Sequence, residues 1–259
     1  MATATALQPS KFVLHERGNW SPRDDRKSFA VWLGIFWLGV VVGFAEDFPR
    51  YLHQNPPAPL VTHIHAVVFS AWLLIFTAQV LLVTGDRVAL HRKLGWVAAG
   101  WAVAMLIVGP LAAMATLASR VHLPDYEPQF LAVNIVDLGG FFLLLAWGIT
   151  LRKNPAAHKR VMLLAMVAIA DPGFSRALNF LPYYNTRAVP WFTEVFYGNV
   201  LLIALMAWWD WRQGRLMKQF VIGATAILAS ELVAAGLYFS PSWRALSTTW
   251  VEAWARRMG

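Results

Sequence analysis

Three carboxylates, Asp137, Asp171 and Glu231, lie inside long apolar stretches of this chain. On insertion scales a charge at the centre of a bilayer costs roughly 2.5–3.5 kcal/mol, so such residues face a protein interior or a watery cavity rather than lipid. At ~1.5 Å of rise per residue, all three map to the middle or outer half of their stretches. We therefore predict a shared polar site inside a membrane protein.

Further polar residues could complete this site. Asn134 lies three residues before Asp137 and shares its helical face. Arg176 follows the triplet Asp171–Pro172–Gly173, which should kink or open a helix. His65 lies early in another apolar stretch, where it would face the interior. The predicted binding set comprises six residues: His65, Asn134, Asp137, Asp171, Arg176 and Glu231.

Part of this set also permits a metal centre. His63, His65 and Asp137 combine imidazole and carboxylate groups, which suit zinc, iron or copper. Side chains two residues apart on a helix point about 200° from each other, so both histidines reach one metal only if this turn is irregular. A haem would need a second histidine at the depth of His65. His91 and His158 lie in basic clusters at helix ends and are interpreted as interfacial anchors.

Each carboxylate also has a purely structural interpretation. Asp171 could form a buried ion pair with Arg176, five residues further on, that only fixes packing. Glu231 could be protonated and bonded to a neighbouring helix, because burial disfavours the charged form. Asp137 precedes Gly139–Gly140, a pair of small residues that is typical of close helix packing.

The elements that would position these residues are helices. Of the 259 residues 58% are hydrophobic and 14% are charged, outside the range of ordinary soluble domains. The absence of cysteine excludes disulfides and thiolate metal sites. We predict an all-α, polytopic membrane bundle of seven transmembrane helices, each near the ~20 residues that cross a bilayer. The predicted spans are Phe29–Ala45, Leu60–Val83, Leu94–Leu117, Phe130–Leu151, Arg160–Leu181, Phe192–Trp209 and Gln219–Phe239.

The basic residues predict the orientation of the bundle. With the N-terminus inside and the C-terminus outside, fifteen of the 22 basic residues fall in inner segments and seven in outer segments. They are scattered beside spans, so the net charge of +8 indicates topology and not nucleic-acid binding. We expect a cytoplasmic segment over residues 1–28, a transmembrane domain over 29–239 and an amphipathic helix on the outer surface over 240–259.

Two short motifs carry a family resemblance. A span with Thr62–His63–Ile64–His65 and Gln79 precedes Leu90–His91–Arg92–Lys93–Leu94–Gly95, and His158–Lys159–Arg160–Val161–Met162 follows later. In these features, over roughly residues 60–165, the chain resembles a group of uncharacterised bacterial multi-pass membrane proteins, a domain of unknown function. The resemblance implies the bacterial plasma (inner) membrane and no particular mechanism.

The leading hypothesis is an outward-opening intramembrane site for a small ligand, ion or proton, with a role in transport or sensing. One alternative is a membrane-embedded metal- or haem-dependent redox enzyme acting on a lipid or quinone. Another is an assembly or scaffold protein whose polar groups only specify helix pairing. The lipid bilayer is the expected partner, and the sequence leaves the cofactor, the oligomeric state and any enzymatic activity open.

Overall fold

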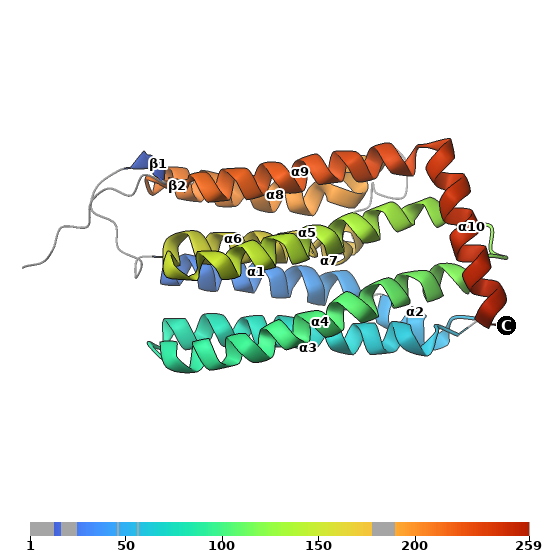
Figure 1. Cartoon of the computed structure of the whole chain (residues 1–259), viewed down its shortest axis with the longest axis horizontal. Coiled ribbons are helices and arrows are strands. Elements are labelled where there is room, and N and C mark those ends of the chain that lie inside the picture. The colour runs from blue at the N-terminus through green and yellow to red at the C-terminus, as the bar shows by residue number, and fades with distance from the viewer. Residues whose placement is uncertain (1–12, 17–24, 46, 56, 178–189, 259) are drawn as a thin grey trace, which may run out of the picture.

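Long, roughly parallel helices form a bundle in the computed structural model, which describes residues 13–16, 25–45, 47–55, 57–177 and 190–258 (Figure 1). Two short strands and two 3₁₀ turns (η1 and η2) accompany the helices. The elements are β1 Val13–Glu16, α1 Arg26–Ala45, α2 Asp47–His53, α3 Leu60–Thr84, α4 Val88–Ala118, η1 Pro128–Phe130, α5 Leu131–Thr150, η2 Leu151–Lys153, α6 Pro155–Val167, α7 Asp171–Ala177, α8 Trp191–Arg212, β2 Arg215–Met217, α9 Lys218–Tyr238 and α10 Pro241–Met258.

Six of the described helices are long and apolar enough to cross a membrane: α1, α3, α4, α5, α8 and α9. In a helix the backbone N–H and C=O groups pair with each other. This pairing is necessary in the hydrocarbon of a membrane, because lipid tails form no hydrogen bonds. Many large apolar side chains on these helices point away from the protein, as expected where lipid is the solvent. Examples are Leu38, Val67, Leu74, Leu143 and Leu232. The predicted all-α membrane bundle is confirmed, and the chain is a multi-pass membrane protein.

The predicted fifth span, Arg160–Leu181, is not one continuous helix. Helix α6 ends at Val167 and α7 begins at Asp171, so the expected break before Pro172 is confirmed. Proline fits the first turn of a helix because its missing N–H would have no partner there. The amide of Gly173 then donates to the carbonyl of Ala170 at 3.0 Å. The end of the predicted span, residues 178–181, lies outside the described residues.

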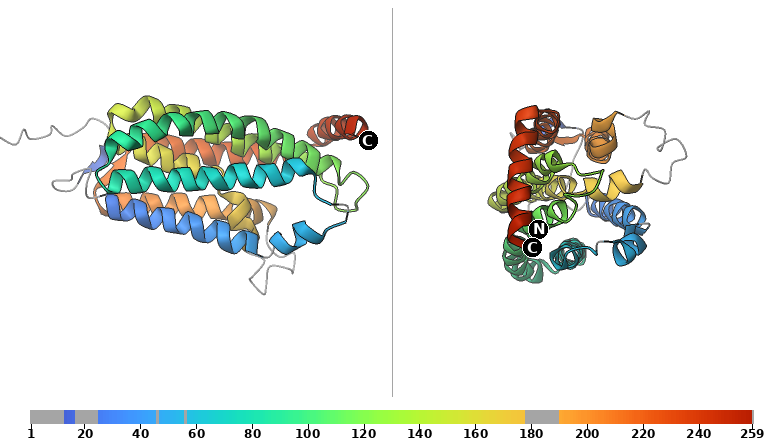
Figure 2. Two further views of the ribbon diagram at one scale, coloured as in Figure 1. Left: turned by 90° about the horizontal axis from the view of Figure 1, so that it is seen from below. Right: turned by 90° about the vertical axis from the view of Figure 1, so that its right-hand side faces the viewer.

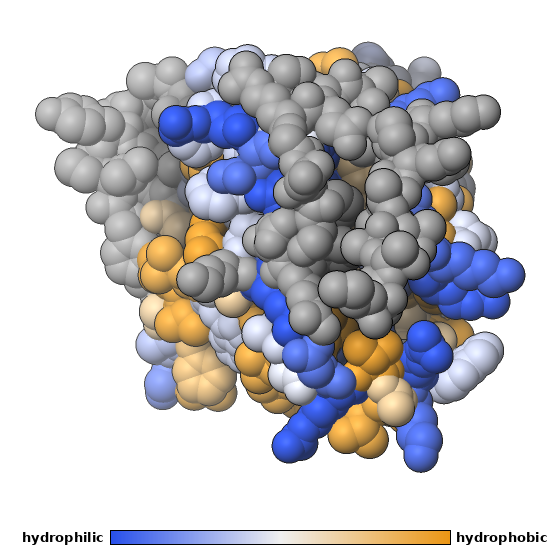
Figure 3. Space-filling model, turned by 90° about the vertical axis from the view of Figure 1, so that its left-hand side faces the viewer, coloured by the Kyte–Doolittle hydropathy of each residue, from blue (hydrophilic) through white to orange (hydrophobic). Residues whose placement is uncertain are grey.

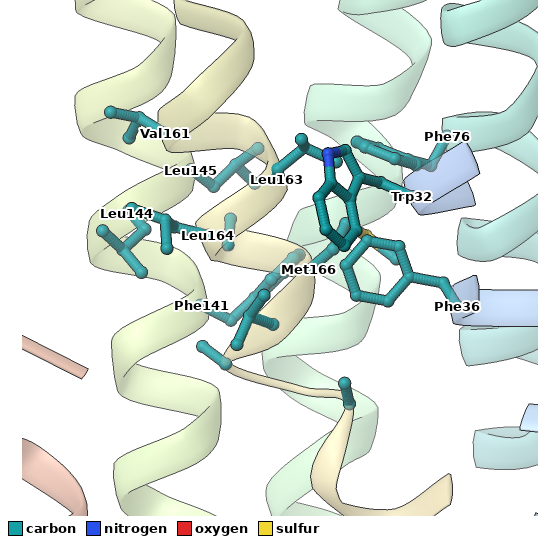
Figure 4. Close-up of a cluster of buried hydrophobic side chains, with 14 of the residues drawn as sticks. Trp32, Phe36, Phe76, Phe141, Leu144, Leu145, Val161, Leu163, Leu164 and Met166 are labelled. Atoms are coloured by element: carbon teal, nitrogen blue, oxygen red, sulfur yellow. The ribbon is translucent and has the colours of Figure 1, made fainter. Parts of the chain in front are cut away.

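Helix α6 packs in the middle of the bundle. It contacts α5, α8 and α9, while α3 pairs with α4, and α7 contacts both α1 and α8. Figure 4 shows the apolar core on both sides of α6 and the non-helical turn that follows it. The labelled side chains come from α1, α3, α5 and α6: Trp32, Phe36, Phe76, Phe141, Leu144, Leu145, Val161, Leu163, Leu164 and Met166.

The two ends of the bundle are built differently. At one end, β1 pairs antiparallel with β2, a contact that the sequence did not predict. At the other end, α10 runs across the bundle, transverse to the long helices (Figure 2). Helix α10 lies within the segment 240–259, for which an outer-surface amphipathic helix was predicted, and it packs on protein: the side chains of Ser247 and Val251 are fully buried, and Trp243 Nε1 donates to the carbonyl of Gln129 at 3.0 Å. Most of the predicted segment 1–28 lies outside the described residues.

We predict that Gly43→Ala destabilises the bundle. Helices α1 and α7 cross so closely that a Cβ at residue 43 would overlap the carbonyl oxygen of Gly173. Overpacking of this kind costs about 1–3 kcal/mol, and a backbone group cannot rotate away. The melting temperature in detergent should fall. The matched control is Gly34→Ala on the same helix, where a Cβ meets nothing within 4 Å; equal melting of the two variants would contradict the close crossing.

Candidate functional site

Two of the predicted carboxylates share one hydrogen-bond donor in the interior. Asn199, on α8, donates from Nδ2 to Asp171 Oδ2 at 2.9 Å and to Glu231 Oε1 at 2.9 Å. Asp171 begins α7 and Glu231 lies on α9, so the amide links three separate elements. The three residues are 2%, 1% and 1% exposed, in the order Asp171, Asn199 and Glu231. Interior polar contacts of this kind are strong because the surroundings screen them little.

The third carboxylate, Asp137 on α5, completes the group. It lies within electrostatic reach of both Asp171 and Glu231. Asp137 is densely surrounded by protein atoms but keeps part of its surface accessible, whereas the other members are sealed. We call these four residues, Asp137, Asp171, Asn199 and Glu231, the carboxylate layer.

Three oxygen atoms of the carboxylate layer are buried without a hydrogen-bond partner among the described residues: Asp171 Oδ1, Asn199 Oδ1 and Glu231 Oε2. The described part of the chain also places no basic side chain in an ion pair with these carboxylates. A buried charge without compensation costs several kcal/mol, so the negative charge here must be neutralised by a proton or by a bound cation.

The carboxylate layer lies at one depth. Asp137, Asn199 and Glu231 are each six to eight residues from the helix end nearest α10, or about 10 Å at ~1.5 Å per residue. The residues three or four positions deeper are buried and apolar on every element: Phe141, Val167, Leu202 and Ile227. The layer is therefore sealed from the β1–β2 end of the bundle by the apolar core.

A second apolar group separates the layer from the end that carries α10. Val133, Val195, Phe196 and Ala234 are buried there, on the three helices that hold Asp137, Asn199 and Glu231. Aromatic rings cover this group. Trp191 stacks on Tyr238 with ring centroids 4.0 Å apart, and the rings of Phe192 and Phe196 are 5.1 Å apart. We call the three rings outside this group, those of Trp191, Phe192 and Tyr238, the aromatic cover.

Arg176 does not pair with Asp171, which removes the structural interpretation of that carboxylate as half of an ion pair. Its guanidinium bonds to Asp47 on α2 and donates to the carbonyl of Pro172 at 2.6 Å. His65 lies within electrostatic reach of Arg176 and stacks on Phe69, with ring centroids 4.0 Å apart. The predicted set is thus divided into the carboxylate layer and a separate region around Arg176 and His65.

Asn134 does not join the carboxylate layer, and the predicted metal ligands do not come together. Asn134 is exposed and is not hydrogen-bonded to the layer among the described contacts. His63 is also exposed, and within the described ranges no group of three histidine, cysteine or acidic side chains has the geometry to hold a metal ion. The set His63, His65 and Asp137 is therefore not brought together, since the helix is regular there and the two histidines diverge.

The sequence analysis missed a second polar cluster at the β1–β2 end. Arg160 on α6 is almost fully buried and holds the carboxylate of Asp210 with two donors, while a third donor reaches Asp25 Oδ2 at 3.1 Å. Lys159 and Arg215 also pair with Asp25. We call these five residues the ion network. The sequence analysis uses Arg160 as a topology signal and as part of the second histidine motif, and does not predict its acidic partners Asp25 and Asp210.

The chain matches no protein family model, no curated protein and no solved structure. Function is therefore inferred from the side chains of the site, because one fold supports many activities. The carboxylate layer offers oxygen atoms only, which bind protons and hard cations. The ion network is compensated within the protein and has the character of a structural clamp.

We predict that ionised Asp25 stabilises the fold and that acid removes this contribution. Burial would raise the pKa of Asp25, but the charges of Arg160, Lys159 and Arg215 together hold that pKa below its ordinary value of 3.8. A lowered folded-state pKa means that the stabilisation is present above pH ~4 and is lost as the pH falls through the folded-state pKa. Asp25→Asn should therefore lower the melting temperature strongly at pH 7, by the equivalent of about 3 kcal/mol, and by less at pH 3.

Thermal unfolding in detergent at both pH values measures this difference. Asp125→Asn is the control, because Asp125 pairs with Arg120 at the surface with 62% of its side chain exposed. Such surface pairs contribute about 0–1 kcal/mol. A loss of stability in Asp25→Asn that is the same at pH 3 and pH 7 would show that ionisation of Asp25 is not the cause.

Proposed function

We propose that this protein is a carrier of the bacterial plasma membrane that binds and exchanges protons at the carboxylate layer. One observation supports this above all others: Asn199 is shared between Asp171 and Glu231, and each of these carboxylates keeps a buried oxygen without a partner among the described residues. Protons complete such an arrangement, because a protonated carboxyl gains an O–H donor while its other oxygen still accepts.

Protons suit this layer better than a transition metal does. Three acidic side chains gather there, but their geometry does not form a metal-ligand group in the described part of the chain. Like charges at short range in a poorly screened interior repel, so a proton taken up by one carboxylate relieves the other two. The three groups would then bind protons as a unit rather than independently.

The accessible surface of Asp137 suggests how protons could reach the carboxylate layer. Asp137 is the member with accessible surface, so we propose that it receives protons and passes them to Asp171 and Glu231. The aromatic cover then acts as the gate toward the outer side, and an outward-open state requires Trp191 and Tyr238 to separate. The break between α6 and α7 supplies backbone that can move without breaking a continuous helix.

The topology of the proposal has seven crossings, with α6 and α7 together making the fifth. The distribution of basic residues supports the N-terminus inside and the C-terminus outside, so α10 lies on the outer face. Figure 3 views the opposite end, where the described surface carries hydrophilic side chains together with hydrophobic ones. The resemblance of the histidine-containing loops to bacterial multi-pass proteins supports the location.

We predict that infrared difference spectra between pH 6 and pH 9 contain the C=O stretch of protonated carboxyl groups. Replacing both Asp171→Asn and Glu231→Gln should remove most of this band, because the neutral amides keep the size of the side chains but bind no proton. The same variant, reconstituted in liposomes that enclose a pH-sensitive dye, should lose proton uptake driven by a membrane potential.

Glu252→Gln is the matched control, since Glu252 lies on α10 with 43% of its side chain exposed. This variant should retain both the infrared band and the uptake. Proton uptake of wild-type size by the double variant, or an unchanged carboxyl band, would refute the proposal. A melting temperature close to that of the wild type shows that the double variant is folded.

A further inference from the structure

Two histidines from separate helical hairpins meet at the β1–β2 end of the bundle. His91 lies in the first turn of α4 and His158 in the first turn of α6. Their ring centroids are 6.3 Å apart and the rings are nearly perpendicular, at 80°. Both side chains are half-buried. The two similar histidine motifs of the sequence therefore converge on one place, which the interpretation as separate interfacial anchors did not anticipate.

The hydrogen bond of His158 fixes the position of its ring proton. His158 Nδ1 lies 2.7 Å from the carbonyl oxygen of Gly148. A carbonyl oxygen only accepts, so Nδ1 carries the hydrogen of the neutral ring. The other nitrogen, Nε2, is then an acceptor with a lone pair. His158 can bind one more proton, and it does so at Nε2.

The hydrogen bonds of His91 fix the opposite tautomer. In the amide orientation that satisfies both of its groups, Gln79 Oε1 accepts from the amide of Gly95 at 2.9 Å, and Nε2 donates to the carbonyl of His91 at 3.1 Å and to His91 Nδ1. Because Nδ1 is an acceptor here, the hydrogen of the neutral His91 ring lies on Nε2. Reversing the amide would place two donors face to face at Gly95.

We propose that His91 and His158 form a proton-binding pair that takes up one proton at a time, at His158 Nε2. In the neutral state one ring presents N–H and the other a lone pair, so the two Nε2 atoms have opposite hydrogen-bonding roles. Uptake converts His158 to an imidazolium that keeps its bond to Gly148. A second proton would have to enter at His91 Nδ1, where it displaces the bond from Gln79 and adds positive charge beside protonated His158 and Arg92, which lies within electrostatic reach of His91.

A bridging transition metal fits the pair less well. Both Nε2 atoms would have to donate lone pairs, so His91 would need its hydrogen on Nδ1, facing the NH₂ group of Gln79. Proton binding needs no such rearrangement. This pair lies at the end of the bundle opposite the aromatic cover, and its behaviour does not depend on the carboxylate layer. It links the hairpin of α3 and α4 to that of α5 and α6, so its charge acts where these hairpins meet.

Nitrogen NMR of the full-length, histidine-labelled protein in lipid tests the proposal, because protonated and unprotonated ring nitrogens have different chemical shifts. At high pH, His91 should be the Nε2–H tautomer and His158 the Nδ1–H tautomer. On acidification, His158 should gain a proton first, while His91 stays neutral. The variants His91→Gln and His158→Gln assign the signals.

The control variant is Gln79→Leu, which should leave His158 unchanged and give His91 a mixture of tautomers. Three results would overturn the proposal: His91 as Nδ1–H in the wild type, protonation of both rings at the same pH, or Zn²⁺ binding at one equivalent that is lost in both histidine variants. The last result would identify a metal site. The wild-type tautomers decide the question even if one histidine variant does not fold.

Discussion

Asn199 has two amide hydrogens, and the interior of the protein commits its Nδ2 group to two carboxylates. The arrangement of α7, α8 and α9 depends on this shared donor, because each acidic side chain is buried where water cannot replace it. The long helices satisfy their own backbones, so the few remaining polar groups determine which helices meet at this depth. The unpaired oxygens of the layer are then buried acceptors for which the described protein groups supply no donor.

The two polar clusters of the bundle differ in whether their buried carboxylates are paired with basic side chains. In the ion network, the carboxylates of Asp25 and Asp210 face three cations, and within the described part of the chain Arg160 pairs with both of them. Such a cluster is costly to break, since removal of one partner leaves a buried charge. In the carboxylate layer, by contrast, three acidic side chains lie together without a basic partner among the described residues. The two clusters therefore differ in whether the described protein supplies a counter-charge for its buried carboxylates.

The sequence predicted features that depend on neighbouring residues, such as helix positions. It missed the ion pairs between residues that are far apart in the sequence. Hydropathy placed the six long helices within a few residues, except that α4 begins at Val88 rather than Leu94, since Arg92 and Lys93 near its start reduce hydropathy. The triplet at Asp171 predicted the break because proline acts on its own backbone. Spacing could not show that Arg176 selects Asp47 instead of Asp171, or that Arg160 selects Asp210, because these partners lie on helices distant in sequence.

The same limit explains why the predicted binding set does not include Asn199 and why the two inner histidines were interpreted separately. An asparagine near a helix start has no feature in the sequence that identifies the acids it will meet. His91 and His158 carry a repeated motif, but a repeat predicts similar positions on two hairpins and not their convergence. Depth along a helix was predictable from the rise per residue, which is why Asp137, Asp171 and Glu231 were expected to share a layer.

The broken helix connects the two clusters mechanically. Helix α6 carries Arg160 in the ion network, and α7 begins with Asp171 in the carboxylate layer, with only the turn at residues 168–170 between them. Because α6 is held by charges that cannot separate cheaply, a change at Asp171 moves α7 more readily than α6. Helix α7 is in turn packed against α1 and α8, with Gly173 directly on the backbone of Gly39. Protonation of the layer would therefore act first on α7 and its neighbours, while the opposite end of the bundle stays closed.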